Sequence, residues 1–182
     1  TAIDYFWFSA DQNYSEAQYK LGEIYYEGVF VIQDIQKAIR YFTTAADQNH
    51  SKSQFYLGII YYEGKFVRKD LIKAISYYTL AADQDYPEAL YNLGLIYYEG
   101  ELVKQDINKA INYFSLAEKQ NYPKAQYNLG VIYSEGKYVP KDFKRAIRYF
   151  SFAADQNYSE AQYNLGSLFL KIYNNSEISV TD

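Results

Sequence analysis

The sequence contains no cysteine and no methionine, and it has only one histidine and three prolines. Without cysteine the chain cannot form a disulfide framework, a thiolate zinc site, an iron–sulfur cluster or a cysteine nucleophile. One imidazole also excludes a histidine-rich metal site. No apolar run approaches the length of about 18 residues that a membrane helix needs, and the first residues do not form a signal peptide. We therefore expect no metal, no cofactor and no membrane insertion.

The charge and the N-terminus exclude little more. The net charge of −4 gives no general attraction to nucleic acid or anionic lipid, so no nucleic-acid partner is expected. The chain begins at Thr1 without a start methionine, which leads us to expect a fragment or a processed product. What the sequence does contain is aromatic: 24 tyrosines and 11 phenylalanines among 182 residues.

The nine glycines reveal a repeat, because every one of them lies in one of two series with a step of 36 residues. The first series is Gly22, Gly58, Gly94, Gly130 and Gly166, and the second is Gly28, Gly64, Gly100 and Gly136. A period of this length is typical of repeat arrays. We predict four full repeats at 14–49, 50–85, 86–121 and 122–157. The trailing helix of a truncated repeat (1–13) precedes them, the first helix of a final repeat (158–173) follows, and 174–182 form a polar tail. We expect 1–173 to be a single solenoid domain.

Each repeat is predicted to contain two helices. In the third copy the first helix runs from about Pro87 to Tyr98 and ends at Gly100 with positive φ. Asp106 suits the N-cap of the second helix, which ends at Asn121. In other copies Ser15 and Gln18 have the spacing of a capping box. Such helix pairs bury their apolar faces only by stacking, so the fold class expected is all-α, a right-handed α-solenoid of helix–turn–helix repeats.

The repeated residues carry a family resemblance. The frame E-A-x-x-x-L-G-x-x-Y-x-x-G, followed by V-x-x-D-x-x-K-A-x-x-Y, resembles the Sel-one-like repeat (SLR), a relative of the tetratricopeptide repeat, over residues 2 to about 170. The matching residues of the third copy are Glu88, Ala89, Leu93, Gly94, Tyr97, Gly100, Val103, Asp106, Lys109, Ala110 and Tyr113. The usual second loop glycine is replaced by Phe30, Phe66, Leu102 or Tyr138. In the family frame the tyrosine columns that begin at Tyr25 and Tyr5 belong to the core.

No catalytic constellation can be assembled. His50 occupies a turn position where the other copies have tyrosine, and we interpret it as a simple replacement. Glu27, Glu63, Glu99 and Glu135 recur once per repeat, which is typical of a solvated rim rather than of a local acid–base pair. We predict that the protein is not an enzyme.

The resemblance implies a non-catalytic scaffold or adaptor whose concave groove, lined by the first helices, binds a peptide or protein. Asn92, Asn128 and Asn164 stand out there, because an amide can satisfy both the N–H and the C=O of a peptide backbone. The alternative is that these three asparagines are solvated surface residues, present only because asparagine is abundant in this chain. The other residues assigned to the groove are Tyr19, Phe55, Tyr91, Tyr127, Tyr163, Ile59, Leu95, Val131, Tyr26, Tyr62 and Tyr98.

Two alternatives remain open. Apolar residues near the ends predict a structural module that self-associates end to end, because natural solenoid caps are polar outside. These residues are Phe6, Trp7, Phe8, Leu168, Phe169, Leu170 and Ile172. A more remote alternative is the β-lactam-like small-molecule binding of the cysteine-rich branch of the family, whose disulfides this chain lacks.

Overall fold

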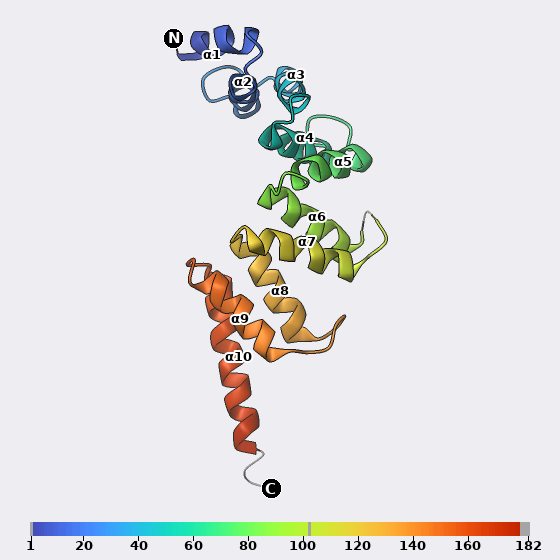
Figure 1. Ribbon diagram of the computed structural model, residues 1–182, viewed down its shortest axis with the longest axis vertical. Helices are drawn as coiled ribbons and strands as arrows, with labels where there is room; N and C mark the ends of the chain where they lie inside the picture. The colour runs from blue at the N-terminus through green and yellow to red at the C-terminus, as the bar shows by residue number, and fades with distance from the viewer. Residues whose placement is uncertain (1, 102, 179–182) are drawn as a thin grey trace. The chain divides into compact units, whose positions relative to one another are not determined.

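The computed structural model describes residues 2–101 and 103–178, and this part of the chain contains ten α-helices and no strand (Figure 1). The helices are α1 (Ala2–Asp11), α2 (Ser15–Glu27), α3 (Ile35–Ala46), α4 (Ser51–Glu63), α5 (Leu71–Ala82), α6 (Pro87–Glu99), α7 (Ile107–Lys119), α8 (Pro123–Glu135), α9 (Phe143–Ala154) and α10 (Ser159–Ile178). The predicted architecture of stacked helix–turn–helix repeats is confirmed. Leu102 and residues 179–182 lie outside the described residues, and α10 continues past residue 173, where the repeat pattern ends.

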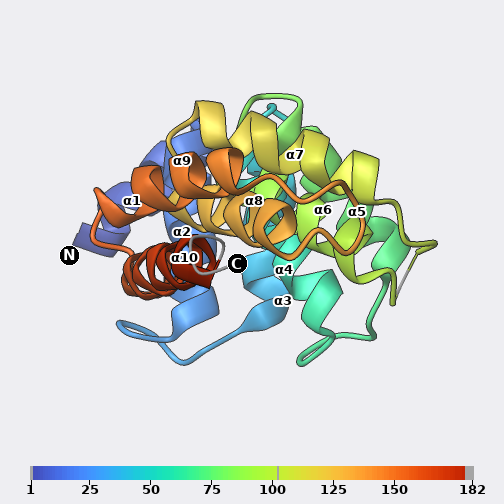
Figure 2. The ribbon, with the colours of Figure 1, turned by 90° about the horizontal axis from the view of Figure 1, so that it is seen from below.

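The helices form two compact units, one up to Leu93 and one from Gly94 onward. In the first unit α2 packs on α3, α3 on α4 and α4 on α5. In the second unit α7 packs on α8, α8 on α9 and α9 on α10. The loops between α2 and α3 and between α4 and α5 project from their helices, as Figure 2 shows.

The helix ends follow the local chemistry of the sequence. Asp34, Asp70, Asp106 and Asp142 cap the second helices, each accepting a hydrogen bond from the backbone N–H three residues on at 2.9–3.0 Å. Asn49, Asp85, Asn121 and Asn157 adopt φ of 56–63° at the inter-repeat turns, and Gly100 has φ 69°. The predicted aspartate N-caps and the predicted left-handed helix ends are therefore both confirmed. Asparagine, aspartate and glycine suit these helix ends because they tolerate the left-handed region best.

The predicted capping box is wrong. Tyr14, not Ser15, is the N-cap of α2, and its side chain makes no cap hydrogen bond. Gln18 is instead buried and donates from Nε2 to the Ala10 carbonyl at 3.3 Å and to Asn13 Oδ1 at 3.1 Å. Gln48, 30 residues on, donates to Gln18 Oε1 at 2.7 Å. The glutamine therefore joins the turns of successive repeats, a contact that a local spacing cannot reveal.

The glycines inside the first helices each face a ring of the second helix. An added Cβ on Gly130 would lie 2.5 Å from Cδ1 of Phe150, and Gly22, Gly58 and Gly94 face Phe42, Tyr78 and Phe114 in the same way. These four rings are among the most deeply buried side chains of the described chain. The sequence predicted the close approach but not its partner. A Cβ on Gly166 in α10 would meet no atom of the described residues within 4 Å.

Of the two tyrosine columns expected in the core, Tyr25 is buried there, whereas the other members except Tyr5 are half-buried at its margin. Within each repeat the first-helix tyrosine stacks on the second-helix tyrosine, as for Tyr25 on Tyr41 with centroids 5.8 Å apart and planes 6° from parallel. Lys37 Nζ lies 5.0 Å from the Tyr25 ring centroid, and a lysine or arginine repeats this contact in the next three copies. Tyr5 in α1 is 77% exposed.

Candidate functional site

The surface of the first helices, where the groove residues were predicted, is half-buried rather than fully exposed. Most members of the set have intermediate exposure, including Phe55, Ile59, Tyr91 and Leu95. Tyr163 is the opposite extreme at 75% exposed. The assignment of Tyr19 to an open groove is wrong, because its side chain is only 4% exposed. His50 and Tyr56 cover its ring, with centroids at 5.0 and 5.9 Å.

A charged cluster closes the first-helix surface around Tyr19. The Tyr19 hydroxyl donates to Glu23 Oε1 at 2.7 Å, and Lys20 Nζ donates to Glu23 Oε2 at 2.8 Å. Burial, reinforced by the Glu23 carboxylate, raises the pKa of Tyr19. Burial alone would raise the pKa of Glu23, but the hydrogen bonds from Lys20 and Tyr19 hold it below its ordinary value. Charged side chains of the protein itself therefore cover this end of the first-helix surface.

In the first unit an aromatic side chain fills the space between successive repeats. The Tyr56 ring stacks on Phe42 with centroids 5.0 Å apart and planes 21° from parallel. It also meets Tyr26 edge-on, at 5.7 Å and 79°. Position 56 belongs to the same repeat column as Asn92, Asn128 and Asn164, so the ring stands where later repeats carry an amide.

In the second unit the corresponding space is open. A cavity of about 230 Å³ is lined by Tyr98, Phe114, Tyr127, Asn128 and Val131. Four of these residues were predicted from the sequence. Phe114 was missed as a site residue, because its place in the apolar face of the second helix assigned it to the core. The cavity is thus mainly aromatic and aliphatic, with one amide in its wall.

The three asparagines are not equivalent. The Asn92 amide lies close enough to the Tyr78 hydroxyl, a group of the buried column, to oppose the rise of its pKa on burial. Asn164 donates from Nδ2 to the Tyr127 hydroxyl at 3.2 Å. Asn128 lines the cavity together with Phe114. The three asparagines therefore have different surroundings and do not form a ladder of identical side chains.

A second, more polar cavity adjoins the first in the same unit. Its volume is about 380 Å³, and it shares Val131 with the aromatic cavity. Asn164, whose amide bonds Tyr127, also lines it, so the hydrogen bond joins the walls of the two cavities. The remaining lining residues are Ser134, Glu135, Lys141, Phe143, Phe150, Ser167, Leu168 and Lys171.

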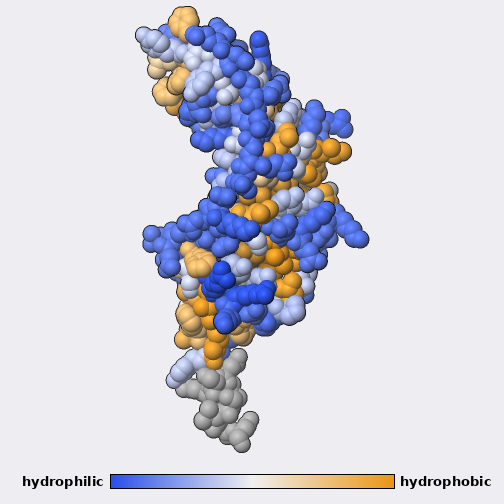
Figure 3. Space-filling view, viewed as in Figure 1, coloured by the Kyte–Doolittle hydropathy of each residue, from blue (hydrophilic) through white to orange (hydrophobic). Residues whose placement is uncertain are grey.

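The apolar residues of the terminal helices divide into packed and exposed ones. Leu168 is 6% exposed and packs in the core with Phe150, and Ile172 packs against the same cluster, so Leu168 is not available for self-association. Phe6 packs against the cluster of Ala10 and Leu21. Trp7, Phe8, Phe169 and Leu170 are exposed. In Figure 3 apolar side chains are visible over α1 and over α10.

The side chains that were considered for acid–base chemistry either cap a helix or are exposed to solvent. His50 caps α4: its Nδ1 accepts from the Ser53 N–H at 3.3 Å, and its Nε2 lies 3.1 Å from Glu16 Oε2. Glu27, Glu63, Glu99 and Glu135 are all exposed. Within residues 2–101 and 103–178 no group of three or more metal-ligating side chains occurs, and no helix is long and apolar enough to cross a bilayer.

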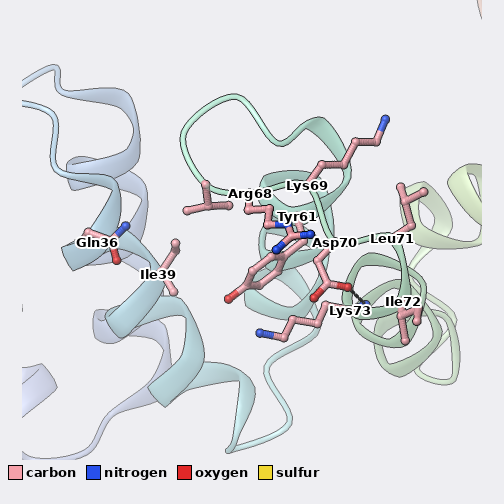
Figure 4. Close-up of a pocket in the computed structure, with 10 residues that line it drawn as sticks. Gln36, Ile39, Tyr61, Arg68, Lys69, Asp70, Leu71, Ile72 and Lys73 are labelled. Carbon is pink, nitrogen blue, oxygen red and sulfur yellow. Dashed lines mark hydrogen bonds between the residues drawn. The ribbon is translucent and has the colours of Figure 1, made fainter.

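A pocket on the loop side of the first unit has no counterpart in the sequence prediction. Its volume is about 810 Å³, and it lies between α3, the loop before α5 and the start of α5 (Figure 4). Gln36 and Ile39 form one wall, and Tyr61, Arg68 and Lys73 lie opposite. The Asp70 carboxylate in it is already bonded to the Lys73 N–H at 3.0 Å. The pocket is formed by the helix cap and loop of one repeat against the second helix of the preceding repeat.

Comparison with known proteins adds the family context. The model of the family described as Sel1 repeat matches residues 15–50, 51–86, 87–122, 123–158 and 159–177. A protective antigen of uropathogenic Escherichia coli with an SLR fold, c5321, is 31% identical with a TM-score of 0.89, over 93% of this chain and 36% of that one. A Sel1 repeat protein from Oxalobacter formigenes is 32% identical with a TM-score of 0.86, over 92% of this chain and 68% of that one.

A more distant structural neighbour is a cysteine-rich protein. Cysteine-rich protein B of Helicobacter pylori is 28% identical with a TM-score of 0.58, over 76% of this chain and 99% of that one. The present chain contains no cysteine. It spans about a third of the length of the E. coli antigen. No curated protein sequence matches the chain significantly.

Proposed function

The chain belongs to the Sel1 repeat family, and from that premise we propose that it is a non-catalytic interaction module that binds a peptide or protein segment on its first-helix surface. Sel1 repeats are generally protein–protein interaction modules. The observation that supports this surface is the cavity of Tyr98, Phe114, Tyr127, Asn128 and Val131. Small pockets lined by aromatic residues with one convergent polar group are typical of binding sites.

The cavity has the parts that peptide recognition needs. Tyr98, Phe114 and Tyr127 offer apolar surface, which supplies most of the affinity in interfaces. The Asn128 amide carries a donor and an acceptor, so it can satisfy a backbone N–H and C=O of an extended segment. Among the described residues, no charged side chain lines this cavity. The surface therefore favours an apolar segment held by its backbone.

The test is a selection of displayed random peptides on the wild-type chain. Selected peptides are then titrated against Asn128→Tyr, which should fill the cavity, and against Asn112→Tyr, a matched change at an exposed position of α7. We expect Asn128→Tyr to weaken binding at least about tenfold, a loss of about 1.4 kcal/mol. Asn112→Tyr should leave affinity unchanged. Peptides that bind both variants equally well would contradict the proposed surface.

A second candidate function is self-association through α1 and α10. The exposed Trp7, Phe8, Phe169 and Leu170 favour it, because contiguous apolar surface on terminal helices is unusual for a soluble cap. Light scattering over a concentration series tests this candidate. Growth of the apparent mass that disappears in Phe8→Glu supports it, and a constant monomer mass at high concentration removes it.

A further inference from the structure

We infer that the cavity of the second unit accepts one aromatic side chain of the bound segment, stacked on Phe114 and edge-on to Tyr98. The inference rests on the proposed function and makes it specific, because it names the chemistry of the anchoring residue. The first unit of the chain contains the same site with an aromatic side chain already in it.

The two sites correspond residue by residue at a separation of two periods. Each lining residue of the cavity has its equivalent 72 positions earlier, and only one of the five pairs exchanges a ring for an amide. The pairs are Tyr98 with Tyr26, Phe114 with Phe42, Tyr127 with Phe55, Asn128 with Tyr56, and Val131 with Ile59.

The occupied site shows which occupant such walls accept. Tyr56 stacks on Phe42 at 5.0 Å and meets Tyr26 edge-on at 79°. Offset-stacked and edge-to-face geometries are those that aromatic quadrupoles favour. The second unit keeps both of these walls, as Phe114 and Tyr98, and has a cavity beside them with Asn128 at the position of Tyr56. Tyr98 also meets the Tyr138 ring edge-on, at 5.9 Å and 81°. A ring supplied by a ligand restores the same arrangement.

The dimensions of the cavity agree with a ring. An apolar cavity of about 150 Å³ is large enough to bind benzene, and the present one measures about 230 Å³. Asn128 is short enough to leave the ring position open, and it presents its amide at the cavity wall. The aromatic side chain would thus supply the anchor and the amide would hold the adjoining backbone.

The experiment uses the whole chain and three small probes. N-acetyl-phenylalaninamide, N-acetyl-tyrosinamide and N-acetyl-leucinamide are titrated into isotope-labelled protein, and chemical shifts are followed by NMR. We expect the two aromatic probes to bind with dissociation constants on the order of millimolar, with shifts at Asn128, Val131 and Tyr98. The leucine probe should bind about fivefold more weakly. Equal binding of the leucine probe would overturn the inference.

Two reciprocal variants localise the site. Asn128→Tyr places at position 128 the residue that repeat two carries, and it should lower the affinity for the aromatic probes at least about tenfold. Tyr56→Asn should open the equivalent site in the first unit and add shifts at Phe42 and Tyr26. Thermal melting of both variants checks that they are folded. Unchanged aromatic binding in a folded Asn128→Tyr would also overturn the inference.

Failure of the inference and failure of the proposed function give different results. If displayed peptides without aromatic residues are selected and Asn128→Tyr still abolishes their binding, the interaction surface stands and the aromatic anchor is wrong. If the aromatic probes bind the cavity but no displayed peptide depends on it, the anchor site stands and the peptide-binding function is wrong.

Discussion

Asn164 in α10 donates a hydrogen bond of 3.2 Å to the hydroxyl of Tyr127 in α8, 37 residues earlier in the chain. The contact joins two successive repeats across the first-helix surface and fixes one wall of the aromatic cavity. An asparagine of this repeat column can therefore form a hydrogen bond within the protein rather than to a ligand.

Stability should separate these asparagines. Asn164→Ala removes the partner of the Tyr127 hydroxyl, and we expect it to lower the free energy of unfolding by about 0.5–1.5 kcal/mol. Asn128→Ala should leave that free energy nearly unchanged, because Asn128 lines an open cavity. Urea denaturation of both variants provides the measurement. A larger loss for Asn128→Ala than for Asn164→Ala would show that the two roles are reversed.

Two glycines of one column should respond oppositely to alanine. Gly130→Ala places a Cβ 2.5 Å from the Phe150 ring, and we expect overpacking to cost about 1–3 kcal/mol. Gly166→Ala meets no atom within 4 Å, so the better helix propensity of alanine should stabilise the chain by up to about 1 kcal/mol. Thermal melting curves measure both effects. Similar melting temperatures for the two variants would be inconsistent with the packing described above.

The buried glutamine network predicts a dependence on side-chain volume. Gln126 donates to Asn121 Oδ1 at 3.2 Å, and Gln156 donates to Gln126 Oε1 at 2.7 Å. Gln126→Leu should cost about 1–2 kcal/mol, because Gln156 keeps its second bond to Asn121 at 3.1 Å and leucine fills the space. Repeat three carries Leu90, which is buried, at this position.

The matched change is Gln126→Ala, which loses the same hydrogen bonds and also leaves a cavity. We expect a cost of about 2–4 kcal/mol, larger than for leucine. Chemical denaturation of the two variants side by side gives the difference. If alanine were as well tolerated as leucine, the glutamine would contribute little packing at the turn.

The buried tyrosines predict a loss of stability at alkaline pH. Burial raises the pKa of Tyr78, although the nearby Asn92 amide acts in the opposite direction, and burial also raises the pKa of Tyr19. Between the unfolded tyrosine pKa of about 10 and these higher folded values the unfolded chain binds fewer protons, so the free energy of unfolding falls as pH rises. Below about pH 10 this contribution to stability is fully present.

Absorbance of tyrosinate during an alkaline titration, followed together with helical circular dichroism, measures this effect. We expect part of the tyrosine absorbance to appear only as the helices unfold. In Tyr78→Phe, which places the residue found at Phe42, Phe114 and Phe150, the melting temperature should fall less between pH 9 and about pH 10.5. Complete tyrosine ionisation in a chain that retains its helices would contradict the burial of these hydroxyls.

Much of the fold follows from local chemistry and could be predicted from the residues of a single repeat. The Asp106 cap and the left-handed Asn121 are properties of short segments, and the structure confirms both of them. The close approach at Gly94 was also predictable, because an invariant glycine inside a helix column indicates a crowded neighbour. The Gln18 network was not, since its partner Gln48 is 30 residues away.

The sequence by itself determined that this protein is an array of helix pairs with a 36-residue period, where the helices end and which columns contain its glycines and tyrosines. Only the tertiary structure decided which first-helix positions are closed and which are open. Tyr19 is buried and Asn128 lines a cavity, although both were predicted to face the same groove. The physical reason is that each space is bounded by two successive repeats, so its occupancy depends on side chains that a single column does not show.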